Sequence, residues 1–271
     1  MVKDSAETGR KERAGAKPRN RLFVESLAKG LRLLESFAQA PHPLSLSEIA
    51  ARAGADRSAA QRLTHTLLEL GYLERVPAGV RLGPRNLERA FDYLRASELV
   101  NRAVPIMADL RREVKERVDL SLFDGDTLLY LVRMQSKRDT SHSHLIGRRI
   151  PTFCTAGGRA ILSRMSMNEA LGVLSRCDMK PINARTITDI AQILGEIEKA
   201  RVAGFSVSLE ETLIGEISAA SAILDAAGQP VAALHICASL GDWRQEDYAE
   251  RMGPLVAAAA DALSGAYGAS G

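Results

Sequence analysis

Residues 44–84 read LSLSEIAARAGADRSAAQRLTHTLLELGYLERVPAGVRLGP, and this stretch decides the fold of the N-terminal part of the chain. Ser45 and Glu48 have the S-x-x-E spacing of a capping box, in which each side chain accepts a hydrogen bond from the backbone N–H of the other residue. A helix is therefore predicted to begin at Leu46. Gly54 adopts left-handed backbone angles without strain, so it is expected to end this helix after about two turns.

A second helix is predicted to follow at once, because Asp56 can cap a segment that runs from Arg57 to Leu70. One face of this segment is apolar and consists of Ala60, Leu63, Leu67 and Leu70. The side chains off that face are polar, namely Arg57, Ser58, Gln61, Arg62 and His65. A helix that reads a DNA major groove needs this division, since it packs one face on its own domain and offers hydrogen-bonding groups from its first turns.

The pattern then changes to that of a small hairpin. Residues 72–76 and 80–82 are short runs separated by Pro77-Ala78-Gly79, and they carry Arg75 and Arg81. Two guanidinium groups on such a wing can contact phosphates. The stretch is therefore predicted to be a winged helix-turn-helix that binds double-stranded DNA. The alternative, an ordinary helical hairpin with a charged face in solvent, is disfavoured by the capped turn and the basic wing.

Charge and composition bound the class of protein. The chain has 271 residues, of which 25% are charged, and a formal net charge of +3. Residues 1–21 hold many cations and no apolar periodicity, which predicts a disordered basic arm. The chain contains no apolar run typical of a secretory signal or a membrane span, so we expect a cytoplasmic protein. The three cysteines, an odd number at unrelated spacings, favour reduced thiols over disulfides.

Helical patterns lie on both sides of the winged stretch. Residues 26–37 are expected to form the helix at the base of the DNA-binding domain. The face that it buries is predicted to consist of Leu27, Leu31 and Leu34. Residues 97–118 form another helical pattern, interrupted by Pro105, which predicts either a kink or two helices that meet there.

From Asp119 onward the apolar period becomes that of strands. Asp124-Gly125-Asp126 is typical of a hairpin turn between two of them. Further strands are predicted at 205–209, 219–225 and 231–237, and further helices at 158–165, 168–176, 188–202 and 245–262. Strands in hairpins with helices between them indicate an α+β domain, with an antiparallel sheet covered by helices, rather than a doubly wound parallel sheet.

The second half of the chain shows no catalytic constellation, since it has no Walker loop, no HExxH and no GxSxG motif. Cys154 with His142 or His144 could act as nucleophile and base, and His142, His144, His235 and Cys237 could bind a metal. A buried structural thiol and histidines without a metal are the favoured interpretation. We therefore expect no catalytic residues, no metal and no cofactor.

Polar residues recur at predicted inward positions of the strands and their ends, namely Ser208, Glu211, Ser218, Ser221, His235 and Cys237. Buried polar groups cost free energy unless they are paired, and a cavity that binds a small polar molecule would pair them. The loop Thr155-Ala156-Gly157-Gly158 enters a predicted helix, so its free N–H groups could bind a carboxylate. A tight strand-to-helix turn is an equally good interpretation of this loop.

With these residues in view, the chain resembles the IclR family of transcriptional regulators over nearly its whole length after the basic arm. SLAKGLRLLESF at 26–37 and the winged stretch are similar to the family's DNA-binding domain. The spacing Gly204-x3-Ser208-x2-Glu211-x6-Ser218 is similar to its C-terminal signature. Residues 150–155 and 180–189 resemble the branch that controls β-ketoadipate and aromatic-acid catabolism.

The resemblance implies a GAF-like C-terminal domain that binds a small-molecule effector, a helical linker, and homodimers or homotetramers on palindromic operators. The effector-binding residues carried over by position are Ile150, Ala156, Gly157, Ser208, Glu216, Ser218, His235 and Cys237. The branch implies an aromatic or dicarboxylic acid as effector. Glu216 would repel such an acid unless Arg148, Arg149 or His235 compensates for its charge.

The chain is therefore expected to be a ligand-responsive transcriptional regulator, either a repressor or an activator, with no enzymatic activity. Its expected parts are the basic arm (1–21), the winged helix-turn-helix domain (22–84), the helical linker (85–103) and the effector-binding domain (104–271). Two alternatives stay open. One is a metal-dependent or thiol enzyme domain fused to a DNA-binding head, and the other is a protein–protein adaptor that uses the winged fold.

Overall fold

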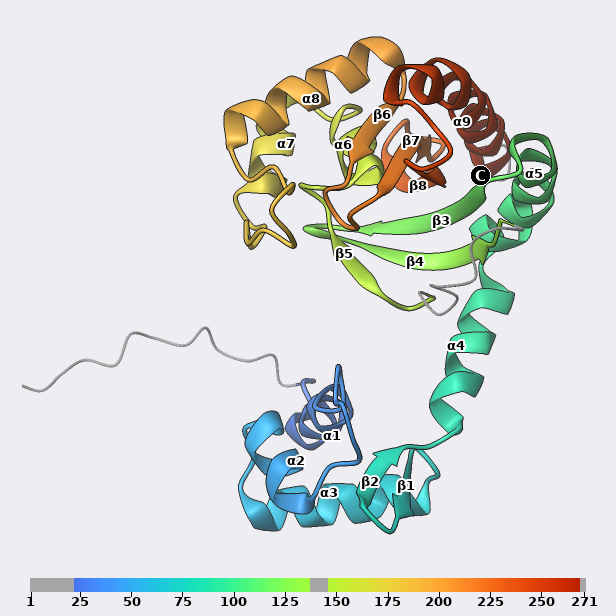
Figure 1. Ribbon diagram of the computed structural model, residues 1–271. Helices are drawn as coiled ribbons and strands as arrows, with labels where there is room; N and C mark the ends of the chain where they lie inside the picture. The colour runs from blue at the N-terminus through green and yellow to red at the C-terminus, as the bar shows by residue number, and fades with distance from the viewer. Residues whose placement is uncertain (1–21, 137–145, 269–271) are drawn as a thin grey trace, which may run out of the picture. The chain divides into compact units, whose positions relative to one another are not determined.

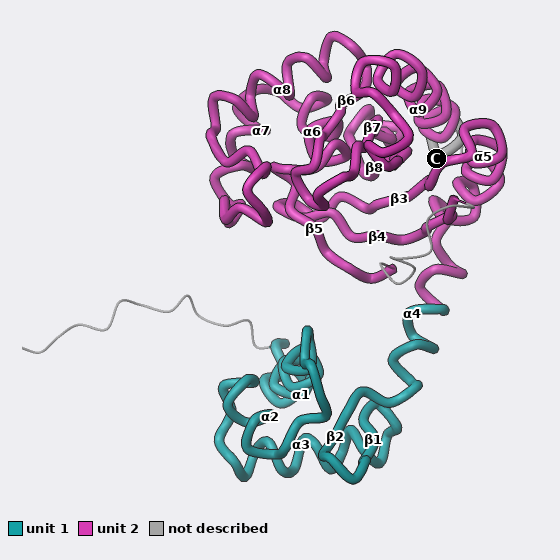
Figure 2. Tube along the Cα trace, viewed as in Figure 1, with its two compact units in different colours: residues 1–91 teal, residues 92–271 magenta. Residues whose placement is uncertain are grey.

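The computed structural model describes residues 22–136 and 146–268 (Figure 1). The chain divides into two compact units, Met1–Phe91 and Asp92–Gly271, which Figure 2 shows in two colours. The predicted basic arm lies outside the described residues, as do His142 and His144. Each unit has a hydrophobic core of its own.

The first unit is a winged helix-turn-helix. Its elements are α1 (Glu25–Glu35), α2 (Leu46–Ala53), α3 (Arg57–Glu69), β1 (Leu73–Val76) and β2 (Gly79–Leu82). The predicted capping box of Ser45 and Glu48 is present, and Gly54 ends α2 with left-handed angles at φ 60°. Asp56 caps α3 by accepting a hydrogen bond of 2.8 Å from the backbone N–H of Ala59. The local signals in the sequence therefore placed this unit correctly.

The buried face of α1 differs from the predicted one. Leu27 and Leu31 are 62% and 52% exposed, whereas Leu33 is fully buried in the core of the first unit. Gly30, Leu33 and Phe37 recur at the i, i+3, i+7 spacing of a helix face, and Gly30 lies close to the Leu63 side chain of α3. The prediction was wrong because a leucine stripe on the other side of α1 has the same period.

Helix α5 (Glu98–Val114) is continuous through Pro105, so two helices do not meet there. Pro105 and Asn101 are exposed, and the Asn101 carbonyl that proline leaves without a helical partner can therefore face water. The boundary between the compact units falls within α4 (Arg85–Ala96). Leu99 and Val100, which the sequence assigned to a linker, are buried in the core of the second unit.

The second unit is built on one six-stranded sheet in which every strand pair is antiparallel (Figure 1). The strands are β3 (Arg117–Asp124), β4 (Thr127–Met134), β5 (Arg149–Pro151), β6 (Ser206–Leu209), β7 (Glu216–Leu224) and β8 (Pro230–Ser239), in the spatial order β5-β4-β3-β8-β7-β6. The predicted α+β class is thus confirmed. Strand β5 was not predicted, because three residues are too few to show an alternating pattern.

Helices cover both faces of this sheet. Helix α5 and the long α9 (Gln245–Gly268) pack on one face, where Leu234 and Ile236 of β8 join the apolar core. The alternate residues of β8, His235 and Cys237, lie on the other face, where α6 (Ala156–Leu162) contacts β7 and β8. Two further helices, α7 (Met167–Leu174) and α8 (Ile190–Ala203), continue this layer. None of the described helices combines the length and apolar character needed to cross a membrane.

Candidate functional site

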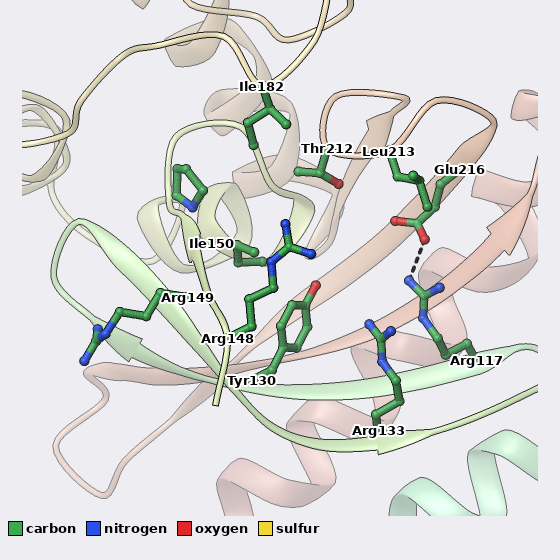
Figure 3. A pocket seen from close by; sticks show the side chains of 11 residues that line it. Arg117, Tyr130, Arg133, Arg148, Arg149, Ile150, Ile182, Thr212, Leu213 and Glu216 are labelled. Carbon is green, nitrogen blue, oxygen red and sulfur yellow. Dashed lines mark hydrogen bonds and ion pairs between the residues drawn. The ribbon is translucent and has the colours of Figure 1, made fainter. Parts of the chain in front are cut away.

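A cavity of about 170 Å³ lies on the α6 side of the sheet in the second unit (Figure 3). Its lining residues are Arg117, Tyr130, Arg133, Arg148, Arg149, Ile150, Pro151, Ile182, Thr212, Leu213 and Glu216. This lining contains four arginines and one carboxylate, with apolar side chains between them. A site of this composition favours a small molecule that has both an anionic group and an apolar body.

Two of the arginines are held in buried ion pairs. Asp119 is fully buried on β3 and accepts hydrogen bonds of 2.8 and 2.7 Å from Nε and Nη2 of Arg133 on β4. Arg117 donates to Asp119 at 3.1 Å through Nε and to Glu216 at 2.6 Å through Nη2. Alternation along β3 places Arg117 and Asp119 on the same face of the sheet. The charges of Arg117 and Arg133 are therefore balanced by two carboxylates within the protein.

The other two arginines lie on β5 and just before it. Arg149 forms an ion pair with Asp124 at 2.5 Å and donates to Thr127 at 2.9 Å, and Figure 3 shows its side chain directed away from the other lining residues. Arg148 is the cross-strand neighbour of Tyr130, whose backbone N–H donates to the Arg148 carbonyl at 3.0 Å, and both side chains line the cavity (Figure 3). Within residues 22–136 and 146–268, the guanidinium of Arg148 has no ion-pair partner.

The hydroxyl of Tyr130 also faces the cavity without a hydrogen-bond partner among the described residues, although the residue is only 8% exposed. Burial, and then the charge of Asp119, raise the pKa of Tyr130 well above its usual value. This phenol is therefore neutral and can donate a hydrogen bond to an anion.

His235 contacts Tyr130 of the cavity lining, with ring centroids 6.0 Å apart. Its Nε2 is 2.7 Å from the Ser121 hydroxyl, and burial lowers the pKa of His235 to about 4. The imidazole is therefore neutral at neutral pH. Gly157 of α6 approaches so closely that a Cβ at this position would overlap the His235 ring.

The effector-binding residues carried over from the family fall into two groups. Ile150 and Glu216 line the cavity. The other six are buried and do not line it, namely Ala156, Gly157, Ser208, Ser218, His235 and Cys237. Contacts connect some of them to the ion pairs, since the Ser218 hydroxyl is 3.3 Å from the Cys237 sulfur, which lies 3.9 Å from an Asp119 oxygen. Their part in binding an effector stays a prediction.

Most of the buried polar groups that suggested a ligand are paired within the protein. Glu211 forms a bidentate ion pair with Arg159 of α6 at 2.6 and 2.7 Å, and both residues are almost fully buried. The Ser221 hydroxyl donates to the Gly204 carbonyl at 2.8 Å. These groups therefore need no ligand to offset the cost of burial. The prediction that Glu211 and Ser221 are buried because a ligand pairs them was wrong.

The loop at residues 155–158 is a tight strand-to-helix turn. The Thr155 hydroxyl accepts a hydrogen bond of 3.1 Å from the Gly158 N–H and donates to the Pro151 carbonyl at 3.1 Å. A Cβ at Gly158 would overlap the Thr152 carbonyl, which explains the glycine. The capped turn accounts for this sequence without a bound anion.

The described residues offer no support for thiol or metal chemistry. Cys154 is fully buried, and burial raises its pKa to about 12, so the thiol stays protonated. Burial likewise raises the pKa of Cys237 to about 12. Over residues 22–136 and 146–268, no three His, Cys, Asp or Glu side chains lie close enough together to hold a metal ion.

The predicted DNA-contacting side chains lie on the surface of the first unit. On α3 the exposed residues include Arg57, Ser58, Gln61, Arg62 and His65, while Ala60 and Thr64 are buried. Arg75 and Arg81 of the wing are also exposed. Arg81, however, forms an ion pair with Glu74, the residue opposite it in the hairpin.

Some residues of the cavity were missed by sequence reasoning. Arg117 fell at the end of a predicted helix, and Asp119, Tyr130 and Arg133 were not singled out. A signal was nevertheless present, since charged residues in otherwise apolar strands are costly to bury and must find partners. The partners themselves depend on strand register, which joins Asp119 to Arg133, and on a pairing between residues 117 and 216.

Comparison with known proteins identifies both units. Residues 91–265 match the family model described as "Bacterial transcriptional regulator IclR C-terminal", and residues 26–77 match the IclR helix-turn-helix domain. The Pca regulon regulatory protein of Pseudomonas putida is 30% identical over 238 residues, which cover 88% of this chain and 82% of that protein. The p-hydroxybenzoate hydroxylase transcriptional activator of Acinetobacter baylyi is 28% identical, over 83% of this chain and 85% of that protein.

A solved structure is similar in fold over most of the chain. It is an IclR homologue from Microbacterium hydrocarbonoxydans in complex with 4-hydroxybenzoate. It has 25% sequence identity and a TM-score of 0.73, and the match covers 89% of this chain and 98% of that one.

Proposed function

The chain belongs to the IclR family of bacterial transcriptional regulators, which are not enzymes, and from this we propose that it is a regulator whose winged unit binds operator DNA in response to an organic acid bound by its second unit. The effector that we propose is an aromatic or dicarboxylic acid. The observation that carries this proposal is the cavity of the second unit, where cationic and apolar side chains line the same space.

Relatives support an acid of this kind. The similar regulators named above carry names that refer to the pca regulon and to p-hydroxybenzoate hydroxylase, and one homologue was crystallised with 4-hydroxybenzoate. A carboxylate on an aromatic ring suits a cavity in which arginines and a tyrosine hydroxyl lie beside isoleucine, proline and leucine side chains. We propose that the lining residues Ile150 and Glu216, with the buried residues around them, shape this site.

On the DNA side, we propose that Arg57, Ser58, Gln61, Arg62 and His65 contact base edges and nearby phosphates from α3, and that Arg75 and Arg81 contact the backbone from the wing. Their shared exposure on one unit supports these roles. Such a regulator would act in the cytoplasm, where bacterial DNA is found.

We also propose that the regulator works as a homodimer or homotetramer. Apolar side chains are exposed at and before α1, and further ones lie on α4; they are Leu22, Phe23, Val24, Leu27, Leu31, Leu87 and Phe91. Exposed apolar patches of this kind are typical of interaction surfaces. Sedimentation equilibrium of Leu27→Asp tests this, because a polar substitution at an interface shifts the protein toward monomer, whereas a monomeric native protein contradicts the proposal.

The experiment that tests the function is selection of bound duplexes from a random DNA pool, repeated with protocatechuate, 4-hydroxybenzoate and β-ketoadipate. The expected result is enrichment of a palindromic sequence whose recovery changes with at least one acid. Failure to enrich any sequence would contradict operator binding. Enrichment that no acid alters, together with no calorimetric heat for any acid, would contradict the proposed effector class.

A further inference from the structure

The arrangement of charges in the cavity points to a more specific ligand. Resting on the proposed function, we infer that the effector carries a single carboxylate, that Arg148 and Tyr130 bind it, and that Glu216 makes the cavity reject a second one. Under this inference the aromatic monocarboxylic acids are favoured over the dicarboxylic acids.

Three of the four arginines in the cavity lining are paired with carboxylates of the protein. Arg133 is paired with Asp119. Arg117 is shared between Asp119 and Glu216, and Figure 3 marks its pair with Glu216. Arg149 is paired with Asp124. Each of these three arginines already has an anionic partner, so a ligand carboxylate gains a full ion pair from them only by displacing a protein carboxylate.

The fourth arginine and a tyrosine hydroxyl are available to a ligand. Among the described residues, Arg148 has no carboxylate partner and the Tyr130 hydroxyl has no hydrogen-bond partner. The two residues are cross-strand neighbours, and both side chains line the cavity (Figure 3). One guanidinium and one phenolic donor are enough to bind one carboxylate through charge-assisted hydrogen bonds.

The apolar side chains and the volume of the cavity suit the part of the ligand beyond its carboxylate. The remaining lining includes Ile150, Pro151, Ile182 and Leu213, which suit an apolar body. The volume of about 170 Å³ is close to that of cavities of roughly 150 Å³ that hold one benzene ring. Glu216 is the one carboxylate in this lining, so a second carboxylate on such a ring would meet a like charge and no further unpaired arginine among the lining residues.

Isothermal titration calorimetry with a matched pair of ligands tests the inference. The probes are 4-hydroxybenzoate and terephthalate, which differ by a second carboxylate in place of the hydroxyl. The native protein is expected to bind 4-hydroxybenzoate at least about tenfold more tightly. Glu216→Gln removes the opposing carboxylate and releases Arg117, so the ratio of the two dissociation constants should fall toward one or reverse.

Two further variants, one inside the cavity and one outside it, complete the test. Arg148→Gln should raise the dissociation constant for 4-hydroxybenzoate by about tenfold or more, since it removes the proposed partner of the carboxylate. Arg112→Gln, whose side chain pairs with Asp109 on the surface of α5 and does not line this cavity, should leave both dissociation constants within about twofold. Circular dichroism of each variant verifies that the fold is kept.

The outcomes separate this inference from the proposed function. If the native protein binds terephthalate as tightly as 4-hydroxybenzoate, or if Glu216→Gln leaves the ratio unchanged, the inference fails while an acid effector stands. If neither acid binds, the inference fails, and the acid effector fails with it only if protocatechuate and β-ketoadipate also give no heat. Selective DNA binding is unaffected by either result.

Discussion

At the scale of single residues, Gly157 fixes how closely α6 approaches the sheet. A methyl group there would overlap the His235 ring, so Gly157→Ala must shift either the helix or the imidazole. We expect the free energy of unfolding of the second unit to fall by about 1–3 kcal/mol. Denaturant unfolding followed by the fluorescence of Trp243, the one tryptophan of the chain, measures this unit specifically.

The matched control is Gly195→Ala in α8. No atom lies within 4 Å of a Cβ built there, and alanine favours a helix by about 1 kcal/mol over glycine. This variant should therefore be neutral or more stable. Equal destabilisation by the two alanines would show that crowding against His235 is not the cause.

The buried His235 gives the second unit a dependence on pH. An unfolded histidine takes up a proton near pH 6.5, whereas burial lowers the pKa of His235 in the folded state to about 4. Between these values the unfolded state binds more protons, so stability falls as the pH is lowered from 6.5 and the loss levels off below 4. The whole effect amounts to about 3 kcal/mol.

The measurement is the free energy of unfolding between pH 4 and pH 7 for the native protein and for His235→Gln, whose amide can still hydrogen-bond to Ser121. The acid loss should be smaller in the variant, because glutamine does not titrate. Parallel pH profiles would mean that His235 is not the group responsible.

Among the helices and strands, the ion pair of Arg159 and Glu211 connects α6 to the segment that follows β6. The backbone N–H of Ile187 also donates to Glu211, at 3.0 Å, so one carboxylate joins three segments. Arg159→Met leaves that carboxylate buried without its cation, which should cost about 3–5 kcal/mol of stability in denaturant unfolding.

An exposed pair provides the comparison. Lys199 and Glu196 lie one turn apart on α8, and Lys199→Met should change stability by less than about 0.5 kcal/mol. The double variant Arg159→Met with Glu211→Met should recover much of the loss, since no charge is then left unpaired. A loss in Arg159→Met no greater than in Lys199→Met would contradict the structural role of the pair.

Helix α3 and the wing should make different contributions to DNA binding. Arg62→Ala is expected to cost about 1–3 kcal/mol on the operator and to relax sequence choice, whereas Arg81→Ala should weaken all DNA alike and flatten the salt dependence. Glu74 pairs with Arg81, so Glu74→Gln should raise the affinity for all DNA by releasing this cation. Fluorescence anisotropy with operator and random duplexes at several salt concentrations measures each effect.

If Arg62→Ala and Arg81→Ala change specific and random DNA equally, then α3 and the wing do not divide base contacts from phosphate contacts in the proposed way.

Helices α2 and α3 could be predicted from the sequence, whereas the cavity could not. Ser45, Gly54 and Asp56 act on residues three or four positions away, so the caps, and with them α2 and α3, followed from local pattern. The cavity depends on distant pairings, such as that of Arg117 with Glu216, which lies 99 positions later. Such pairings are set by the order and register of the strands, and neither property has a local signature.

The surface of α1 illustrates a second limit. Two apolar faces compete on this helix, and period alone could not decide which one is buried. The exposed face then becomes informative, because leucines left in water suggest a partner. The error in the predicted core thus supports the proposed assembly of subunits.

For the regulator as a whole, we propose that an acid bound in the second unit changes the affinity of the first unit for DNA. An effector can do this only if it binds one arrangement of the regulator better than another. Thermodynamic linkage then requires that DNA change the affinity for the acid by the same factor.

The most direct test measures both sides of this linkage on the full chain. The affinity for a selected operator is determined with and without saturating 4-hydroxybenzoate, and the affinity for 4-hydroxybenzoate is determined with and without operator. We expect one common factor, of about 5- to 150-fold, in the two measurements. An acid that binds with the same affinity whether or not the operator is bound would contradict it.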